Sequence, residues 1–517
     1  MHPCLRLDEI VRLIASELVA SGERGTSVAL ACCCKNLEDP VLDVLWTTQR
    51  RLGPLLGSLP GNVWNDGGFI VSATTTPLFL SLNCSVWKAF KRPPTTLELA
   101  RFRKYAQRMR SLTEHAHPSV VSPEVFSILQ PPTINEPLFP NLKILHLWDA
   151  SVECIPFIPS FLSPRTATIH IGFPSSDSHE AAVASVITAF PTLCPNLQGI
   201  AFYSLPNGPV VAAAVSGMVL ATNRNTLRRF HVDCPLTQAA REVICELPHL
   251  GDLSITIGGD TSLPLIVLPS LFNLAVIYGD GSDWLQGFRG ATLGKLKSII
   301  IHSKSNSIGN FLEAFESVML TTTVPATLSA FGFHTSRPWR PNYRSLLPFT
   351  QLGELTIAFS CDQGCSSTID DDTIIDIARA MPNLELLYLG GVPCQTPTGV
   401  TAKGLAALAY YCLNLFALRI HFRVDSLDPP SASIITTSDQ PITSRTDCAL
   451  TTLEVGEMPM MVGSALMVAL TLLHIFPHLE FIEYYNEGWE EVAGAIALSR
   501  KLADASSKKL SLTHSTK

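Results

Sequence analysis

The residues best suited to chemistry in this chain are histidines that recur at equivalent positions of a repeated pattern. They are His146, His170, His231, His302, His334 and His421, six of the 14 histidines present. The first two fall at one position of adjacent copies of the pattern, and His302 and His334 fall at another. Neighbouring strands lie about 4.8 Å apart, so each pair could share a metal ion or form a hydrogen-bonding, pH-sensitive face. No carboxylate or cysteine completes a ligand set at clear spacing, so we predict no metal site, and ordinary surface histidines stay an alternative.

Sequence motifs for catalysis are absent. There is no phosphate-binding Gly-Lys-Ser/Thr loop, no Gly-x-Ser-x-Gly elbow and no His-Glu-x-x-His pair. Cys361 and Cys365 form an isolated pair, interpreted as free thiols. The run Asp370–Asp372 lacks the spacing and glycine of a calcium loop and is better interpreted as a helix start. We therefore predict no catalytic residue, no cofactor and no enzyme activity, with an enzyme of unrecognised site as the weakest alternative.

The histidines belong to a pattern of one apolar residue, two variable residues, an apolar residue, one variable residue and an apolar residue. The thirteen copies begin at Leu142, Thr166, Leu197, Leu227, Leu250, Leu271, Leu296, Leu328, Leu352, Leu384, Leu415, Leu450 and Leu479. Their mean spacing is (479 − 142)/12, or about 28 residues, within the period of leucine-rich repeats. Apolar residues two positions apart indicate a strand, because alternate side chains share a face.

Helical stretches separate the predicted strands. They include His179–Phe190, Val210–Ala221, Thr237–Glu246, Gly309–Leu320, Asp372–Met381, Thr401–Cys412 and Gly463–Phe476. One strand–helix unit cannot bury its own apolar faces, whereas stacked units share a core. We therefore predict an α/β solenoid of about 13 irregular leucine-rich repeats over residues 136–486, with parallel strands concave and helices convex. Residues 487–517 are predicted to form a capping helix, Glu490–Leu502, and a polar, disordered tail.

The solenoid departs from the strict repeat at one turn. The usual asparagine or cysteine three residues after the last apolar position is replaced, for example by Ala150 and Leu205, so this turn must be held in another way. Residues beside the second and third apolar positions are expected on the concave face, where exposed aromatic and arginine side chains are typical anchors. The candidate substrate-binding residues are His146, Trp148, Tyr203, His231, His302, His334, Tyr388, Arg419, His421 and Tyr485.

Composition limits the classes of partner. Of 517 residues 46% are hydrophobic and 16% charged, which excludes a mostly disordered chain. A net charge of −7 argues against a dominant nucleic-acid surface. The N-terminus has no signal-peptide pattern, and Met460–Phe476 is interpreted as a packing helix and not a membrane span. The 14 cysteines, thinly spread, indicate free thiols in a reducing compartment. We expect a cytoplasmic or nuclear protein with neither nucleic-acid nor membrane partners.

Residues 1–50 are predicted to form a separate module of three short helices. Leu7, Ile10, Leu13, Ile14 and Leu18 share one face at helical spacing. So small a core is marginal alone and gains stability by packing against a partner. Residues 51–135 are predicted to form a connecting segment with an arginine-rich helix at 97–111. Its cations are interpreted as a solvated face; they are Arg101, Arg103, Lys104, Arg108 and Arg110.

Three blocks of the N-terminal module resemble an F-box. They are Leu-Asp-Glu-Ile-Val-Arg-Leu-Ile from Leu7, Ala-Leu-Ala-Cys-Cys-Cys-Lys-Asn-Leu from Ala29, and Asp-Pro-Val-Leu-Asp-Val-Leu-Trp from Asp39. Together with the repeats, they make the chain similar to the F-box/leucine-rich-repeat proteins abundant in mushroom-forming fungi. One departure is that the usual Leu-Pro of the first helix is Leu7-Asp8 here.

The resemblance implies the substrate-recognition subunit of an SCF-type cullin-RING ubiquitin ligase. The F-box would dock on a Skp-type adaptor, and through it on a cullin, while the repeats would hold a protein substrate. Carried over by position, the adaptor contacts are Leu7, Ile10, Ile14, Leu30, Leu37, Pro40, Leu42, Leu45 and Trp46. Each of these could instead fill the module's own core. The alternative function is a leucine-rich-repeat interaction scaffold whose N-terminal helices only cap the solenoid.

Overall fold

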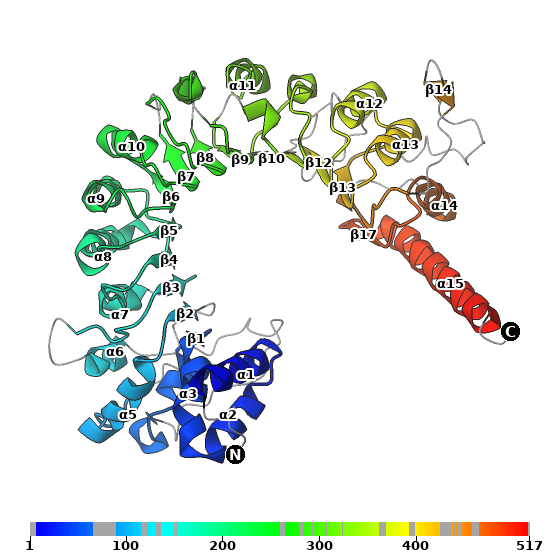
Figure 1. Cartoon of the computed structure of the whole chain (residues 1–517). Helices are drawn as coiled ribbons and strands as arrows, with labels where there is room; N and C mark the ends of the chain where they lie inside the picture. Colours follow the sequence, from blue (N-terminus) through cyan, green and yellow to red (C-terminus); the bar gives the residue numbers. More distant parts are fainter. Residues whose placement is uncertain are drawn as a thin grey trace. The chain divides into compact units, whose positions relative to one another are not determined.

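The chain forms two compact units, Met1–Leu250 and Gly251–Lys517. The computed structural model describes residues 7–65, 89–114, 123–130, 136–148, 150, 152–258, 264–279, 283–291, 293–305, 308–322, 324–360, 369–391, 399–423, 436–437, 440–441, 447–456 and 465–514. Cys361, Cys365 and most of the segment 425–447 lie outside these ranges. Within each unit, parallel strands stand side by side in sequence order and helices lie on one face of the sheet (Figure 1). This α/β arrangement is the one that a repeat solenoid requires.

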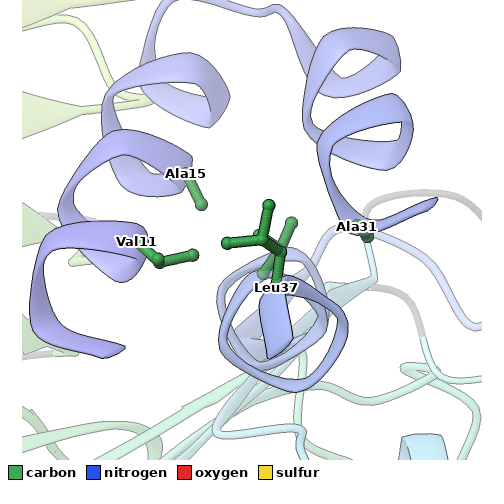
Figure 2. Packing of buried hydrophobic residues seen from close by; sticks show 5 residues of the cluster. Val11, Ala15, Ala31 and Leu37 are labelled. Carbon is green, nitrogen blue, oxygen red and sulfur yellow. The ribbon is translucent and has the colours of Figure 1, made fainter. Parts of the chain in front are cut away.

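The first unit begins with the three predicted helices, α1 (Asp8–Ala20), α2 (Arg24–Cys33) and α3 (Lys35–Thr47). They surround a small core in which Val11 and Ala15 of α1 meet Ala31 of α2 and Leu37 of α3 (Figure 2). Val41 completes this core, and Leu30 and Leu45 pack against it while staying partly exposed. The module therefore buries few large side chains, as its length predicts.

Among the described residues of the first unit, the sheet contains six parallel strands. They are β1 (Thr48–Gln49), β2 (Ser111–Glu114), β3 (Ile144–Leu147), β4 (Thr168–Gly172), β5 (Gly199–Tyr203) and β6 (Arg229–Pro235). Its helices are α4 (Gly53–Leu56), α5 (Thr96–Ala106), α6 (Pro123–Leu129), α7 (Ile158–Phe161), α8 (Glu180–Leu193), α9 (Pro209–Ala221) and α10 (Gln238–Cys245), with the 3-10 turns η2 (Gly61–Val63), η5 (Val152–Phe157) and η6 (Asp177–His179). The sheet thus starts at Thr48, well before the predicted start at residue 136.

The described residues of the second unit include nine parallel strands. They are β7 (Asp252–Ile257), β8 (Asn273–Tyr278), β9 (Ser298–Ser303), β10 (Ala330–Thr335), β11 (Glu354–Phe359), β12 (Leu386–Gly391), β13 (Ala417–Ile420), β16 (Thr452–Gly456) and β17 (Phe481–Tyr484). Its helices are α11 (Phe311–Met319), α12 (Asp371–Ala380), α13 (Ala402–Tyr411), α14 (Ala465–Ile475) and α15 (Glu490–His514), with the 3-10 turns η7 (Asp283–Phe288), η8 (Val324–Ala326), η9 (Tyr343–Leu346) and η11 (Glu487–Trp489). A separate antiparallel pair joins β14 (Thr436–Thr437) to β15 (Gln440–Pro441).

At the C-terminal end one prediction needs adjustment and another is confirmed. The helix predicted to end at Leu502 continues to His514, so most of the expected tail is helical. The stretch predicted as a packing helix is α14, whose Val468, Leu472 and Ile475 are buried. Among the described residues, no helix is both long and apolar enough to cross a membrane.

All thirteen predicted copies of the pattern form strands, and their register is confirmed. In the first unit the second apolar residues pair across neighbouring strands as Leu145, Ile169, Ile200 and Phe230. In the second unit the corresponding row is Leu253, Leu274, Ile299, Phe331, Leu355, Leu387, Leu418, Leu453 and Ile482. These residues are buried toward the helices, and each such side chain contributes about 1.5–3 kcal/mol to folding. Alternation sends the intervening residues to the opposite side of the sheet, which we call the open face.

Carboxylates hold several turns and helix starts together between neighbouring repeats. Asp233 on β6 accepts hydrogen bonds from the amides of Ser204 and Leu205, at 2.6 and 3.1 Å, where Ser204 has a φ of 55°. Glu180 at the start of α8 accepts from the Val210 amide of α9 at 2.7 Å. Asp371 at the start of α12 accepts hydrogen bonds from the amides of Thr401 and Gly404 at the start of α13. These contacts satisfy amides that a turn or a helix N-terminus leaves without an intrahelical partner.

Candidate functional site

The N-terminal module exposes an apolar stripe along α1. Leu7 and Ile14 are 54% and 38% exposed, and Ile10 between them is half-buried. Leu13, which the positional comparison with an F-box did not select, is also exposed. We call Leu7, Ile10, Leu13 and Ile14 the α1 stripe. It lies beside the buried Val11 and Ala15. The apolar surface of α1 is therefore wider than the part that packs into the module's own core.

Two of the nine predicted adaptor contacts are instead part of the module's interior. Leu37 and Pro40 on α3 are buried, because α3 turns this side toward α1 and α2. Their assignment as adaptor contacts is therefore corrected. Leu30, Leu42, Leu45 and Trp46 are half-buried.

Trp46 and the acidic side of α3 contact the arginine-rich helix α5. The Trp46 ring stacks on Tyr105 with ring centroids 4.7 Å apart. Arg108, just after α5, pairs with both Asp39 and Asp43, and its side chain is only 14% exposed. The predicted solvated face of this helix is thus wrong for Arg108, because the charges of α3 complement it. The aromatic and ionic contacts fix the three-helix module against the connecting segment within the first unit.

Further support for this docking comes from α5 itself. Lys104 pairs with Glu38 of α3 at 3.4 Å. Thr95 and Glu98 form a capping box at the start of α5, and Arg92 also pairs with Glu98. The hydrogen bond from Arg92, followed by that from the Thr95 amide, lowers the pKa of Glu98 to about 2. The helix is therefore fixed at its first turn as well as along α3.

The open face of the first unit gathers aromatic side chains at the predicted positions. His146 and His170 pair in register, and their rings stack with centroids 4.2 Å apart and planes 5° from parallel. Trp148 and Tyr203 stack at 5.8 Å across Gly172, which has no side chain to separate them. His231 lies in the same row as His170, with Ala201 between them. Four predicted residues of this unit therefore form one aromatic group, and His231 stands beside it.

The open face of the second unit carries the other histidine pair. His302 and His334 stack with centroids 4.8 Å apart. Burial lowers the pKa of both imidazoles, and Lys304 adds to this at His302 while His302 adds to it at His334. Partial burial thus favours the neutral form of both rings. Within the described ranges, no group of three or more histidine, cysteine or acidic side chains is placed to hold a metal ion.

Tyr388 and Arg419 lie further along the same sheet, next to two glutamates. Arg419 pairs with Glu454 on the neighbouring strand at 3.1 Å. Glu483 stands beside Glu454 on β17. Neither glutamate is among the candidates selected from the sequence, since their charges become significant only beside those of the neighbouring strands. Tyr485, two residues after Glu483, is 72% exposed.

His421 is a predicted substrate contact that the structure corrects. It is 7% exposed and lies one residue beyond the end of β13 at Ile420. Burial, and then the charge of Arg419, lower its pKa to about 4. His421 is therefore a neutral residue of the interior at physiological pH.

The fold and these surfaces define an α/β protein of parallel-strand repeats with a helical N-terminal module. No family model matches the chain, and no curated protein matches it. A crystal structure of a protein from Bacteroides fragilis aligns with 44% of this chain and 60% of its own length, at 12% identity and a TM-score of 0.28. The chain thus spans less than two thirds of that protein, and a TM-score this low carries no argument about fold or function.

Proposed function

We propose that the chain is the substrate-recognition subunit of an SCF-type ubiquitin ligase. The α1 stripe would dock on a Skp-type adaptor, and through it on a cullin, while the open faces of the repeats would bind a protein substrate. The observation that carries the proposal is the exposure of Leu7 and Ile14 on a small bundle that buries little of its own. An exposed apolar stripe is costly in water and is typical of a surface that a partner covers.

A second candidate function is an interaction scaffold in which the three helices only cap the repeats. The contacts of α3 with α5 favour it, because Trp46 and Arg108 join the module to the rest of the first unit. A cap, however, has no use for apolar side chains that point into water. The α1 stripe therefore separates the two functions: it is needed for a receptor and superfluous for a cap.

Adaptor binding by point variants tests the proposal. The full-length chain is co-expressed with a Skp-type adaptor, either unchanged or as the double variant Leu7→Asp/Ile14→Asp. Each apolar side chain removed from water by a partner contributes about 1.5–3 kcal/mol, so we expect a loss of about 100-fold or more in affinity. The control is Leu97→Asp on α5, which replaces a leucine that is 83% exposed outside the module.

The outcomes separate the two functions because the α1 stripe is not part of the core. Binding that is lost in the double variant and kept in the control supports the receptor. A folded full-length chain that binds no adaptor, or that binds equally well in all three forms, refutes it and leaves the cap. Point variants are preferable to deleting residues 1–50, since deletion would strip Tyr105 and Arg108 of their partners.

A further inference from the structure

One row of the open face in the second unit combines charge with aromatic rings. Tyr388 on β12 is in register with Arg419 on β13, Arg419 with Glu454 on β16, and Glu454 with Glu483 on β17. We call these four residues the β12–β17 row. Side chains at paired positions of adjacent strands stand about 4.8 Å apart, so the row places its charged groups within reach of one bound segment.

The charges of the row do not balance. Arg419 is engaged by Glu454, and the two side chains are only 21% and 10% exposed. Glu483 is exposed, and no ion pair to it occurs among the described residues. With His421 neutral, one cation faces two carboxylates at physiological pH.

The excess negative charge contributes to raised pKa values in neighbouring groups. Burial, and then the charges of Glu454 and Glu483, raise the pKa of Tyr388 above its ordinary value. Burial raises the pKa of Glu454 as well; Arg419 opposes this and Glu483 adds to it. A cation arriving beside Glu483 would relieve this repulsion, whereas a carboxylate or phosphate would increase it.

Aromatic rings stand at both ends of the row. Tyr388 occupies the β12 end and is half-buried, and Tyr485 follows Glu483 by two residues and is 72% exposed. An exposed carboxylate with an exposed ring two residues further along the chain suits an ammonium or guanidinium group, which can pair with the first and lie over the second. The Arg419–Glu454 pair, being largely buried, keeps the carboxylates of the row in place.

We propose that the β12–β17 row binds a lysine or arginine side chain of an extended protein segment, with Glu483 pairing the cation and Tyr485 covering it. The inference rests on the proposed function, since it names the class of segment that the receptor would select. An acidic or phosphorylated segment would meet Glu454 and Glu483 and is excluded from this row.

A degenerate peptide library tests the inference without the adaptor, so its outcome is independent of the adaptor experiment. Only the central residue of the peptides is fixed, as arginine, lysine, glutamine or glutamate, and retention on the immobilised full-length chain is measured at low and high salt. We expect the arginine and lysine pools to be retained best, and more so at low salt. In Glu483→Gln this preference should fall about tenfold, as for the loss of one charge-assisted hydrogen bond.

The matched control is Glu316→Gln on α11, which makes the same charge change on the helix-covered face. It should leave the preference unchanged, while Tyr485→Ala should weaken the arginine pool more than the glutamine pool. Equal retention of the four pools overturns the inference, as does a preference that survives in Glu483→Gln. Best retention of the glutamate pool overturns it too, since it would mean an acidic segment.

Discussion

Three consecutive aspartates at the start of α12 have different partners, which makes them a sharp test of how the repeats are joined. Asp371 reaches forward to the next helix. Its carboxylate accepts hydrogen bonds from the amides of Thr401 and Gly404 at 2.8 and 2.9 Å, and from the Thr401 hydroxyl at 2.6 Å. Asp370 caps its own helix by accepting from the Thr373 amide. Asp372 is mostly exposed, and among the described residues its one ion-pair partner is Lys403, at 3.5 Å.

The expected losses follow from these contacts. Asp371→Ala leaves two amides at the start of α13 without their shared acceptor, and a hydrogen bond to a charged group makes a net contribution of about 1.5–3 kcal/mol. We therefore expect a loss of about 2–3 kcal/mol. Asp370→Ala removes an ordinary N-cap, at about 1 kcal/mol. Asp372→Ala breaks an exposed ion pair and should cost less than about 0.5 kcal/mol.

Hydrogen exchange at the start of α13 provides the assay, because it reports local opening between helices as well as global unfolding. Asp371→Ala should speed exchange across residues 401–405 far more than across α12, whereas Asp370→Ala should do the reverse. Urea unfolding of the full chain gives the ranking of the three variants. Equal losses for Asp371→Ala and Asp372→Ala, or faster exchange confined to α12, would refute the forward cap.

Three further predictions follow from the structure. A Cβ at Gly208 would lie 1.9 Å from Glu180 Oε1, so Gly208→Ala should lower the melting temperature by displacing the cap of α9, whereas Gly217→Ala, with open space around it, should raise stability by about 0.5–1 kcal/mol. The pKa of His421 is about 4 in the folded chain and about 6.5 in the unfolded chain. Its contribution to the free energy of unfolding should therefore be fully present above about pH 6.5, fall by about 3 kcal/mol as the pH drops to about 4, and stay constant below that. Urea titrations at several pH values measure this contribution, and His421→Phe should abolish it. Arg108→Ala should cost about 1–3 kcal/mol in thermal unfolding, as expected for a partly buried cation with two carboxylate partners, and speed hydrogen exchange in α3.

The strands of the repeats were predictable because each one carries the apolar pair that its position in the sheet demands. The pattern located thirteen strands and their register, since any slip by one residue would turn apolar side chains such as Leu355 to the open face. It missed β1 and β2 because a polar residue takes an apolar position in each strand: Gln49 in β1, opposite Leu112, and Glu114 in β2. Glu114 is in register with Leu147 and is buried, where its carboxylate accepts from the Leu52 amide at 2.8 Å.

The surfaces were predictable only in part, because a local pattern does not tell which apolar residues a small bundle needs for itself. Leu7, Ile10 and Ile14 share one face of α1 as their spacing predicted, and Leu7 and Ile14 are exposed there, but Leu37 and Pro40 are buried. Trp46 stacks on Tyr105, which is 59 residues away in sequence. A local sequence pattern does not predict such a contact. The same limit hid the charge of the β12–β17 row, which exists only once four strands stand in register.

The missing asparagine of the strict repeat has its physical counterpart in carboxylates that reach between repeats. An asparagine ladder needs the same residue at the same turn of every repeat, which the copies here lack, and they begin from 21 (Leu250 to Leu271) to 35 residues apart (Leu415 to Leu450). Asp233, Glu180 and Asp371 each accept two or more hydrogen bonds from backbone amides of a neighbouring repeat, at the turn or helix start that needs them. Because each carboxylate serves one junction, repeat length can vary without leaving those amides unsatisfied. The unequal lengths of the repeats and the use of a separate carboxylate at each of these junctions therefore go together.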